Sequence, residues 1–177
     1  MFRMIQKWSR YRVLEQFFDY PRKSFLIREL SRNTKLAATA IRLHLNALMA
    51  DGLIKKEKEG LYPSFKAEKE SKFFKLLKAQ NIVFRLNQSG LVEYLEKTTY
   101  PTCIVLFGSA SRGENTETSD IDLFIQSKKV SVDLNKFEKK INRKINILFE
   151  SDIKTISDEL LNNISNGIIL YGYLQVA

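Results

Sequence analysis

The sequence predicts an α+β protein with two domains that are joined by helices. Three observations support this expectation. Apolar residues recur at helical spacing through the first half of the chain, which then shows the pattern of a short basic hairpin. Two short apolar runs, at residues 103–107 and 120–125, resemble strands and flank a polar loop. Finally, the two halves of the chain differ in charge.

Residues 1–99 contain 20 lysines and arginines against 10 aspartates and glutamates, whereas residues 100–177 contain 9 against 10. A basic half beside a nearly neutral half suggests that the first meets a polyanion and that the second has another task. A solvated, lysine-rich surface would give the same composition, so both interpretations stay open at this point.

The length of 177 residues leaves room for one large domain or two small ones. The single cysteine, Cys103, cannot form an internal disulfide, which favours a reducing compartment. No apolar run approaches the 18 or so residues of a membrane span, and the N-terminus lacks the apolar core of a signal peptide. We therefore expect a cytoplasmic protein that does not enter the membrane.

The first domain is expected at residues 1–66. Helical spacing predicts a helix from Met4 to Phe18, a second, short helix from Phe25 to Leu30, and a turn at Asn33-Thr34. A third helix is expected at residues 37–50, with Gly52 as a left-handed stop. Basic residues, a turn and a returning strand then predict a small hairpin, which spans residues 55–65.

This order of elements resembles a winged helix-turn-helix, and the stretch from Leu45 to Ile54 is similar to the end of a recognition helix that enters a wing. The resemblance implies binding to double-stranded DNA. The recognition-helix side chains facing a major groove would be Thr39, Arg42, Leu43 and Asn46, with Arg42 and Asn46 able to reach base edges. The wing residues near phosphates would be Lys55, Lys56 and Lys58. Alternatively, such a domain serves dimerisation or docking without touching DNA. His44, the only histidine, is expected to pack within the domain.

Residues 67–98 are expected to form a helical linker that breaks at Ser89-Gly90. Lysines recur every three residues along its first part, at Lys69, Lys72, Lys75 and Lys78. On a helix this spacing predicts a solvated lysine face, with contact to a phosphate backbone as the alternative.

The second domain is expected at residues 99–177, with a small mixed sheet flanked by helices. Strands are predicted at Cys103–Phe107, Asp120–Ile125 and Ile145–Phe149, with a closing strand at 168–174. Helices are predicted at Asp133–Ile141 and Ile153–Ile164, and residues 108–119 are predicted to be a loop.

Two aspartates carry the chemistry of this domain. Asp120 and Asp122 are two positions apart, so on a strand they lie on the same face. Neighbouring carboxylates repel each other unless a cation lies between them, and Mg²⁺ accepts such oxygen ligands together with phosphates. Gly108 lets the backbone approach a ligand closely, and Ser109 adds a hydroxyl, in a turn whose N–H groups suit a phosphate. A metal beside a phosphate-binding turn is typical of nucleotidyl or phosphoryl transfer.

The pair Gly108-Ser109, ten further residues and Asp120-Ile121-Asp122 resemble the signature of the polymerase beta-like nucleotidyltransferases, and the surrounding residues are similar to their minimal bacterial and archaeal members. The resemblance implies a palm-type fold and transfer of a nucleoside monophosphate from a nucleoside triphosphate, with ATP expected, to an acceptor hydroxyl. Gly108, Ser109 and Arg112 would bind nucleotide phosphates. Asp120 and Asp122 would bind Mg²⁺ or Mn²⁺.

The family normally has a third carboxylate on a neighbouring strand, and the matching position here is Asn146. An amide can ligate a metal through its carbonyl oxygen, but it is neutral and cannot act as a base near pH 7. Glu150 follows four residues later, about 13 Å further along a strand, which is too far to replace it unless the strand bends.

The sequence therefore leaves three functions open. The first is a nucleotidyltransferase coupled to a DNA- or partner-binding domain. The second is a DNA-binding regulator whose second domain senses nucleotide with weak or no catalysis. The third is an antitoxin-like protein that modifies a small helical toxin partner, as related small nucleotidyltransferases do. A homodimer is the expected oligomeric state.

Overall fold

The computed structural model describes residues 8–57 and 62–175 as a mixed α+β fold, as predicted. The chain divides into two compact units, one up to Lys78 and the other from Ala79 onward. No helix among the described residues is long and apolar enough to cross a membrane.

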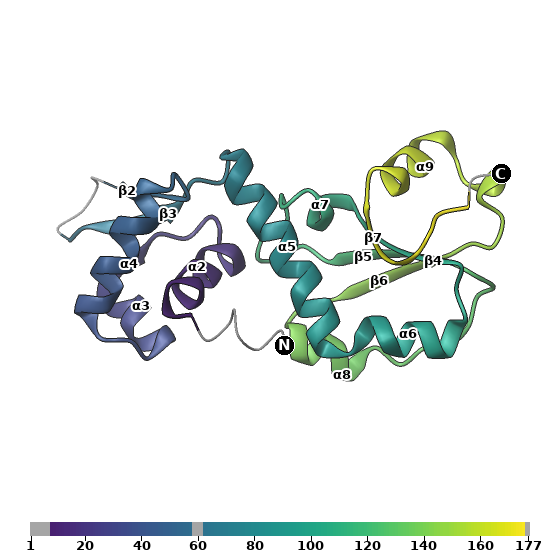
Figure 1. Ribbon diagram of the computed structural model, residues 1–177, viewed down its shortest axis with the longest axis horizontal. Helices are drawn as coiled ribbons and strands as arrows, with labels where there is room; N and C mark the ends of the chain where they lie inside the picture. The colour runs from purple at the N-terminus through teal and green to yellow at the C-terminus, as the bar shows by residue number, and fades with distance from the viewer. Residues whose placement is uncertain (1–7, 58–61, 176–177) are drawn as a thin grey trace. The chain divides into compact units, whose positions relative to one another are not determined.

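The first unit combines helices with a three-stranded antiparallel sheet in the order β1-β3-β2 (Figure 1). Its elements are α2 (Ser9–Asp19), β1 (Phe25–Leu26), α3 (Ile27–Thr34), α4 (Ala38–Ala50), β2 (Ile54–Glu57), β3 (Ser64–Ala67) and the start of α5 (Lys72–Ser89). The predicted helix start at Met4, the hairpin turn at 59–60 and the wing residue Lys58 lie outside the described residues.

Apolar side chains from α2, α4 and the sheet form the core of the first unit. Phe17 of α2 is fully buried and meets Phe25 of β1 edge to face at 5.3 Å between ring centroids. Ile41 and Leu45 of α4 are also buried, at the i and i+4 positions of one helix face. The helical spacing in the sequence therefore identified the buried faces of these two helices.

The second helix begins later than predicted. Phe25 and Leu26 pair with Phe65 and Ser64 of β3, and the helix starts at Ile27. The expected turn at Asn33-Thr34 lies inside this helix, where the Thr34 hydroxyl donates to the Leu30 carbonyl. The predicted start of the helix at Phe25 was wrong because the strand pairing of Phe25 depends on Phe65, which lies forty positions away in the sequence.

The end of α4 agrees with the prediction. Gly52 has φ 67°, its N–H donates to the Met49 carbonyl, and the N–H of Leu53 donates to the Leu48 carbonyl. These two bonds form a Schellman motif, in which the left-handed residue is usually glycine. The motif turns the chain from α4 directly into β2.

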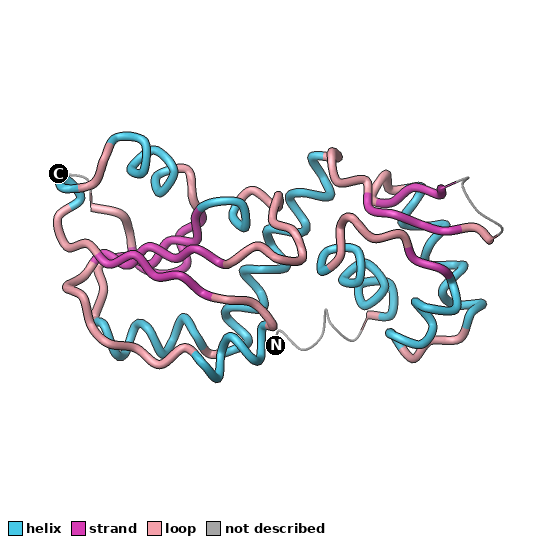
Figure 2. Tube along the Cα trace, turned by 180° about the vertical axis from the view of Figure 1, so that it is seen from behind, coloured by secondary structure: helices cyan, strands magenta, loops and turns pink. Residues whose placement is uncertain are grey.

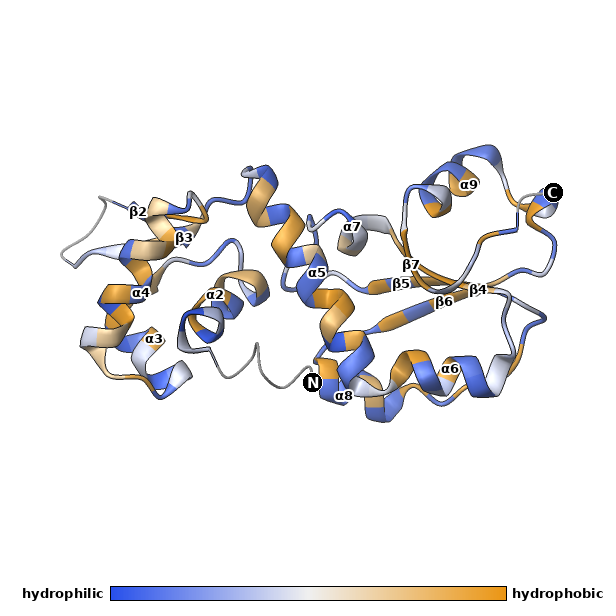
Figure 3. Cartoon of the chain, viewed as in Figure 1, coloured by the Kyte–Doolittle hydropathy of each residue, from blue (hydrophilic) through white to orange (hydrophobic). Residues whose placement is uncertain are grey.

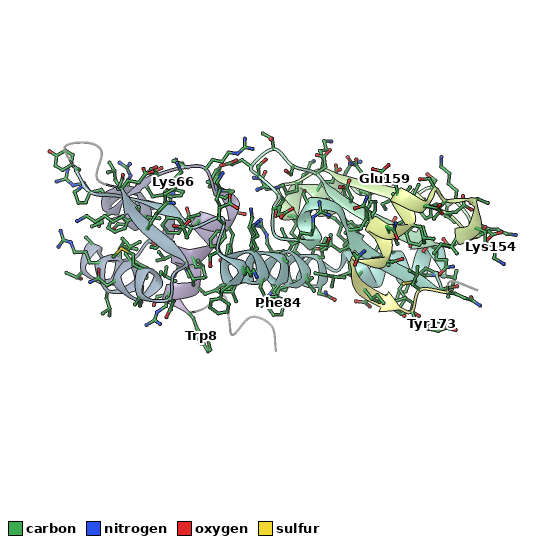
Figure 4. All side chains as sticks on the ribbon, turned by 90° about the horizontal axis from the view of Figure 1, so that it is seen from above. Trp8, Lys66, Phe84, Lys154, Glu159 and Tyr173 are labelled. Carbon is green, nitrogen blue, oxygen red and sulfur yellow. The ribbon has the colours of Figure 1, made fainter. Side chains whose placement is uncertain are left out.

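His44 lies beside a groove of about 650 Å³ in the first unit, as a partly buried residue. Trp8 also lines the groove, and 61% of its surface is exposed; Figure 4 shows it projecting outward. The Nδ1 atom of His44 is buried and has no hydrogen-bond partner within the described part of the chain. Burial, with the nearby Arg10 as the second cause, lowers the pKa of His44 below its usual value of 6.5.

The linker is helical, but its lysine face is only partly solvated. Helix α5 begins at Lys72 rather than at residue 67, because Ala67 still belongs to β3. Lys72 is exposed, whereas Lys78 is 2% exposed and therefore departs from the predicted solvated face. The predicted break is confirmed at Gly90, which has φ 82° and separates α5 from α6.

The second unit contains a four-stranded sheet in the order β6-β5-β4-β7. Strands β5 and β6 are parallel, and the other pairs are antiparallel. Figure 2 shows the strands of this sheet in magenta. Its elements after α5 are α6 (Leu91–Thr99), β4 (Cys103–Phe107), α7 (Gly108–Ser111), β5 (Ile121–Gln126), α8 (Asn135–Ile141), β6 (Ile145–Phe149), η1 (Ile153–Thr155), α9 (Asp158–Ser165) and β7 (Ile168–Gly172).

Helices cover both faces of this sheet. Ile104 of β4 and Leu123 of β5 point to a core that α6 and α8 close with residues such as Leu95 and Phe137. Residues of the opposite face, such as Phe124, pack with Ile164 of α9. Figure 3 shows apolar colouring along the strands between these layers. Strand β4 lies in the middle of the sheet and is buried on both faces, which fits the continuous apolar sequence from which it was predicted.

Three local predictions in this unit were wrong. Gly108–Ser111 forms the short helix α7 within the expected loop. The single helix expected at Ile153–Ile164 is divided into η1 and α9. The Asp152 side chain caps η1 and the Ser157 side chain caps α9, so capping interrupts an apolar spacing that would suit one helix. Helix α8 also begins at Asn135, two residues later than expected.

Candidate active site

The turn after β4 is shaped by Gly108. This residue has φ 73°, which strongly favours glycine, and it follows Phe107, the last residue of the strand. A Cβ atom added at Gly108 would lie 2.8 Å from Oδ2 of Asp122. The glycine therefore permits both the turn and the close approach of a carboxylate to the backbone.

The two aspartates lie at the start of β5. Asp122 pairs with Phe107 of β4, and Asp120 immediately precedes the strand. Ile121 and Leu123 point into the core beneath α6 and α8, so the alternation of the strand places Asp120 and Asp122 on the opposite face. Asp120 is exposed and Asp122 is partly buried, which leaves both carboxylates accessible to a ligand.

Asn146 lies beside both carboxylates. It is the register partner of Asp122 in the parallel pair of β5 and β6. Its side-chain Nδ2 donates to Oδ1 of Asp122 at 3.1 Å and to Oδ2 of Asp120 at 3.3 Å. The structure thus brings together the three residues that the sequence singled out on separate strands.

The predicted phosphate-binding residues lie on α7 and the loop after it. Ser109 is the second residue of α7, and its carbonyl accepts the backbone N–H of Glu114. Arg112 is exposed, and its Nε donates to Oε2 of Glu114 at 3.0 Å. Such an ion pair at the surface contributes little stability, about 0–1 kcal/mol, so a phosphate group could replace Glu114 as the partner of Arg112.

Two polar features of the loop were not found by sequence reasoning. Asn115 is only 3% exposed, although it stands in a polar segment. The N–H of Thr116 donates to the Ser119 hydroxyl at 2.8 Å, which closes a turn directly before Asp120. The available signal was a threonine followed by a serine three positions later, a spacing that favours side-chain turns.

In the part of the chain that the structure describes, no other carboxylate joins the two aspartates. Within residues 8–57 and 62–175, no group of three or more His, Cys, Asp or Glu side chains could hold a metal ion. Glu150 accepts the backbone N–H groups of Ser151 and Asp152 at 2.9 and 3.3 Å, beyond the end of β6. It therefore remains a local turn residue, as its distance along the strand suggested. The carboxylates of Asp120 and Asp122 could serve as oxygen ligands for one hard cation, while Asn146 turns N–H groups toward them.

The predicted DNA-facing residues belong to the first unit. Thr39, Arg42 and Asn46 are exposed on α4, and Leu43 between them is 65% exposed. They occupy the side of the helix opposite the buried Ile41 and Leu45. In the hairpin, Lys56 is exposed, whereas Lys55 forms an ion pair with Glu68 at 3.0 Å.

Comparison with known proteins concerns the second unit. Residues 89–173 match a protein-family model described as "Polymerase beta, Nucleotidyltransferase". A search of curated proteins found no match to the chain. The matched segment runs from the last residue of α5 to just beyond β7 and so includes the whole four-stranded sheet. The family comparison thus supports a polymerase beta-like nucleotidyltransferase domain over the part of the chain that contains Gly108, both aspartates and Asn146.

Proposed function

We propose that the second unit is a divalent-metal-dependent nucleotidyltransferase that transfers a nucleoside monophosphate from a nucleoside triphosphate, ATP first among the candidates, to an acceptor hydroxyl. The observation that carries this proposal is the juxtaposition of Asp122 with Gly108. A carboxylate that can ligate a metal lies against a glycine turn that can approach phosphates. The products would be the modified acceptor and pyrophosphate.

Asp120 and Asp122 would hold Mg²⁺ or Mn²⁺ in this proposal. Gly108 and Ser109 would bind the β- and γ-phosphates, and Arg112 would exchange Glu114 for a phosphate oxygen. The bound metal would neutralise the phosphate charge and stabilise the developing negative charge of the leaving group. The second unit contributes positioning and charge, which account for most of the catalysis in phosphoryl-type transfer.

Asn146 orients the two carboxylates and does not accept the acceptor's proton. Its amide donates to both aspartates and has no basicity near neutral pH. Activation of the acceptor hydroxyl would therefore depend on the metal site and on the acidity of the acceptor itself. We expect slow transfer for this reason.

For the first unit, we propose a winged helix-turn-helix that binds duplex DNA. Helices α2, α3 and α4 are followed by the hairpin of β2 and β3, and α4 presents Arg42 and Asn46 to solvent. Arg42 and Asn46 would read base edges in the major groove with Thr39 beside them, while Lys55 and Lys56 would approach phosphates. This arrangement supports a DNA-bound protein with a nucleotide site.

A second candidate function is a DNA-binding regulator that senses nucleotide without transferring it. The amide of Asn146 at the position of a third carboxylate favours this reading, because metal and nucleotide could still bind where catalysis fails.

A transfer assay distinguishes the two functions. Purified protein, Mg²⁺ or Mn²⁺ and labelled ATP are incubated with and without lysate as the acceptor source, beside the double variant Asp120→Asn/Asp122→Asn. Label that reaches a macromolecule only with the wild type supports the transferase. ATP binding that needs both aspartates, without any transfer, supports the sensor. If the protein does not bind ATP and does not transfer label, both proposals are contradicted.

A further inference from the structure

We infer that this site takes a single divalent cation, together with the nucleotide triphosphate, and that the Asn146 amide excludes a second one. The inference deepens the proposed function and rests on it. It assigns to Asn146 the role of setting how many ions the site holds, which follows from the hydrogen bonds of its amide.

The amide bridges two groups of like charge. Each of the two N–H bonds on Nδ2 can serve one acceptor, and the distances to Asp122 and Asp120 are 3.1 and 3.3 Å. Two neighbouring carboxylates would otherwise repel each other. A neutral donor pair therefore stabilises the ionised aspartates on this side of β5 without a metal.

The two oxygens of Asp122 face different surroundings. Oδ2 lies toward the backbone of Gly108, where the nucleotide phosphates are proposed to bind. Oδ1 accepts the hydrogen bond of Asn146. A cation that bridges carboxylate and phosphate thus finds oxygen ligands on the Gly108 side, whereas the Asn146 side presents N–H donors, which repel a cation.

The charges lead to the same conclusion. Asp120 and Asp122 together supply two negative charges, enough to match one divalent ion. No third acidic side chain joins them among the described residues, since Glu150 is bound to its own backbone and Glu114 to Arg112. To ligate a second ion, the Asn146 amide would have to break both hydrogen bonds and turn its carbonyl oxygen inward, still without adding charge.

The substitution Asn146→Asp should reverse this restriction. A carboxylate at the register partner of Asp122 would remove the donors and add a third negative charge beside the same two aspartates. Asn162→Asp is the matched control, because it adds the same charge at an exposed position on α9.

The test is a count of bound Mn²⁺ in the presence of a saturating, non-hydrolysable ATP analogue, from the electron paramagnetic resonance signal of free Mn²⁺ after equilibrium dialysis. We expect one ion per chain for the wild type and for Asn162→Asp, including the ion that accompanies the triphosphate, and two for Asn146→Asp. Two ions in the wild type, or one in a folded Asn146→Asp variant, would overturn the inference while leaving the proposed function intact.

A different result would contradict the proposed function itself. If the double variant Asp120→Asn/Asp122→Asn binds as many Mn²⁺ ions with the analogue as the wild type does, the aspartates are not a metal site. Circular dichroism establishes whether Asn146→Asp folds. Should it fail to fold, the wild-type count decides alone, because one ion supports the inference and two ions refute it.

Discussion

Gly108 and Asp122 are packed so closely that no side chain fits between them: a Cβ atom on residue 108 would lie 2.8 Å from Asp122 Oδ2. The contact joins the end of β4 to the start of β5, which are also paired through Phe107 and Asp122. The position of the carboxylate and the shape of the turn are therefore determined together.

The first prediction concerns Gly108→Ala. The added methyl group must displace Asp122, and the left-handed backbone adds a strain of about 1 kcal/mol. We expect Mn²⁺ affinity, measured by calorimetry, to fall at least about tenfold, or about 1.4 kcal/mol. Gly90→Ala is the control, because Gly90 also has a positive φ but no atom within 4 Å of an added Cβ. Equal Mn²⁺ binding by both variants would refute the coupling.

The second prediction concerns Asp122→Asn. The substitution removes one of the two negative charges at the site but preserves an oxygen that can accept the Asn146 hydrogen bond. We expect loss of Mn²⁺ binding and of metal-dependent transfer, with a thermal unfolding midpoint close to that of the wild type. Glu159→Gln, which neutralises an exposed acid on α9, should leave Mn²⁺ binding and metal-dependent transfer unchanged. Unchanged transfer by Asp122→Asn would show that the metal site lies elsewhere.

The third prediction tests DNA binding by the first unit. Arg42→Ala should weaken binding to a preferred duplex by about 1–3 kcal/mol, because it would remove the proposed contact to base edges. Lys56→Ala should weaken binding to all duplexes and reduce the salt slope by about one, because it would remove the proposed phosphate contact.

Fluorescence anisotropy at several salt concentrations separates these two effects. Lys154→Ala is the control, since this exposed lysine belongs to the second unit. If all three variants lose the same DNA affinity, the binding is a non-specific attraction between DNA and the positive charge of the protein.

The fourth prediction concerns pH. Burial and Arg10 lower the pKa of His44 in the folded state below 6.5, so the unfolded chain binds more protons in this range. The contribution of His44 to the free energy of unfolding is therefore fully present above pH 6.5, and it is lost as the pH falls through the folded-state pKa. Since the chain has one histidine, His44→Gln should remove this dependence between about pH 5 and 7, as followed by urea unfolding. A wild-type profile retained by His44→Gln would show that carboxyl groups cause it.

Much of the second unit was predictable because its signals are local. The predicted strands at Cys103–Phe107 and Ile145–Phe149 coincide with β4 and β6. The first has the continuous apolar sequence of a strand that is buried on both faces, and the second alternates between apolar residues and the exposed Asn146. Asp120 and Asp122 share a face for the same simple reason of strand alternation. The family resemblance placed Asn146 on a strand beside the aspartates, whereas its hydrogen bonds to both carboxylates are known only from the structure.

The features that sequence reasoning missed depend on distant partners. Phe25 is a strand residue only because Phe65 lies opposite it, whereas apolar spacing alone predicted that Phe25 begins a helix. Lys78 is almost completely buried although its three-residue periodicity indicated an exposed face. Periodicity identifies which side chains share a face, but only the tertiary structure determines what covers that face.

The parallel pairing of β5 and β6 has a consequence for how this site can vary. The connection between the strands, residues 127–144 with α8, can change in length without moving Asn146, provided that the register of β6 is kept. An insertion or deletion of one residue inside β6 would instead place Ile145 or Ile147 opposite Asp122. A hydrocarbon side chain would then replace the amide beside Asp122. The length of the connection can therefore vary, whereas a one-residue insertion or deletion within β6 would destroy the site.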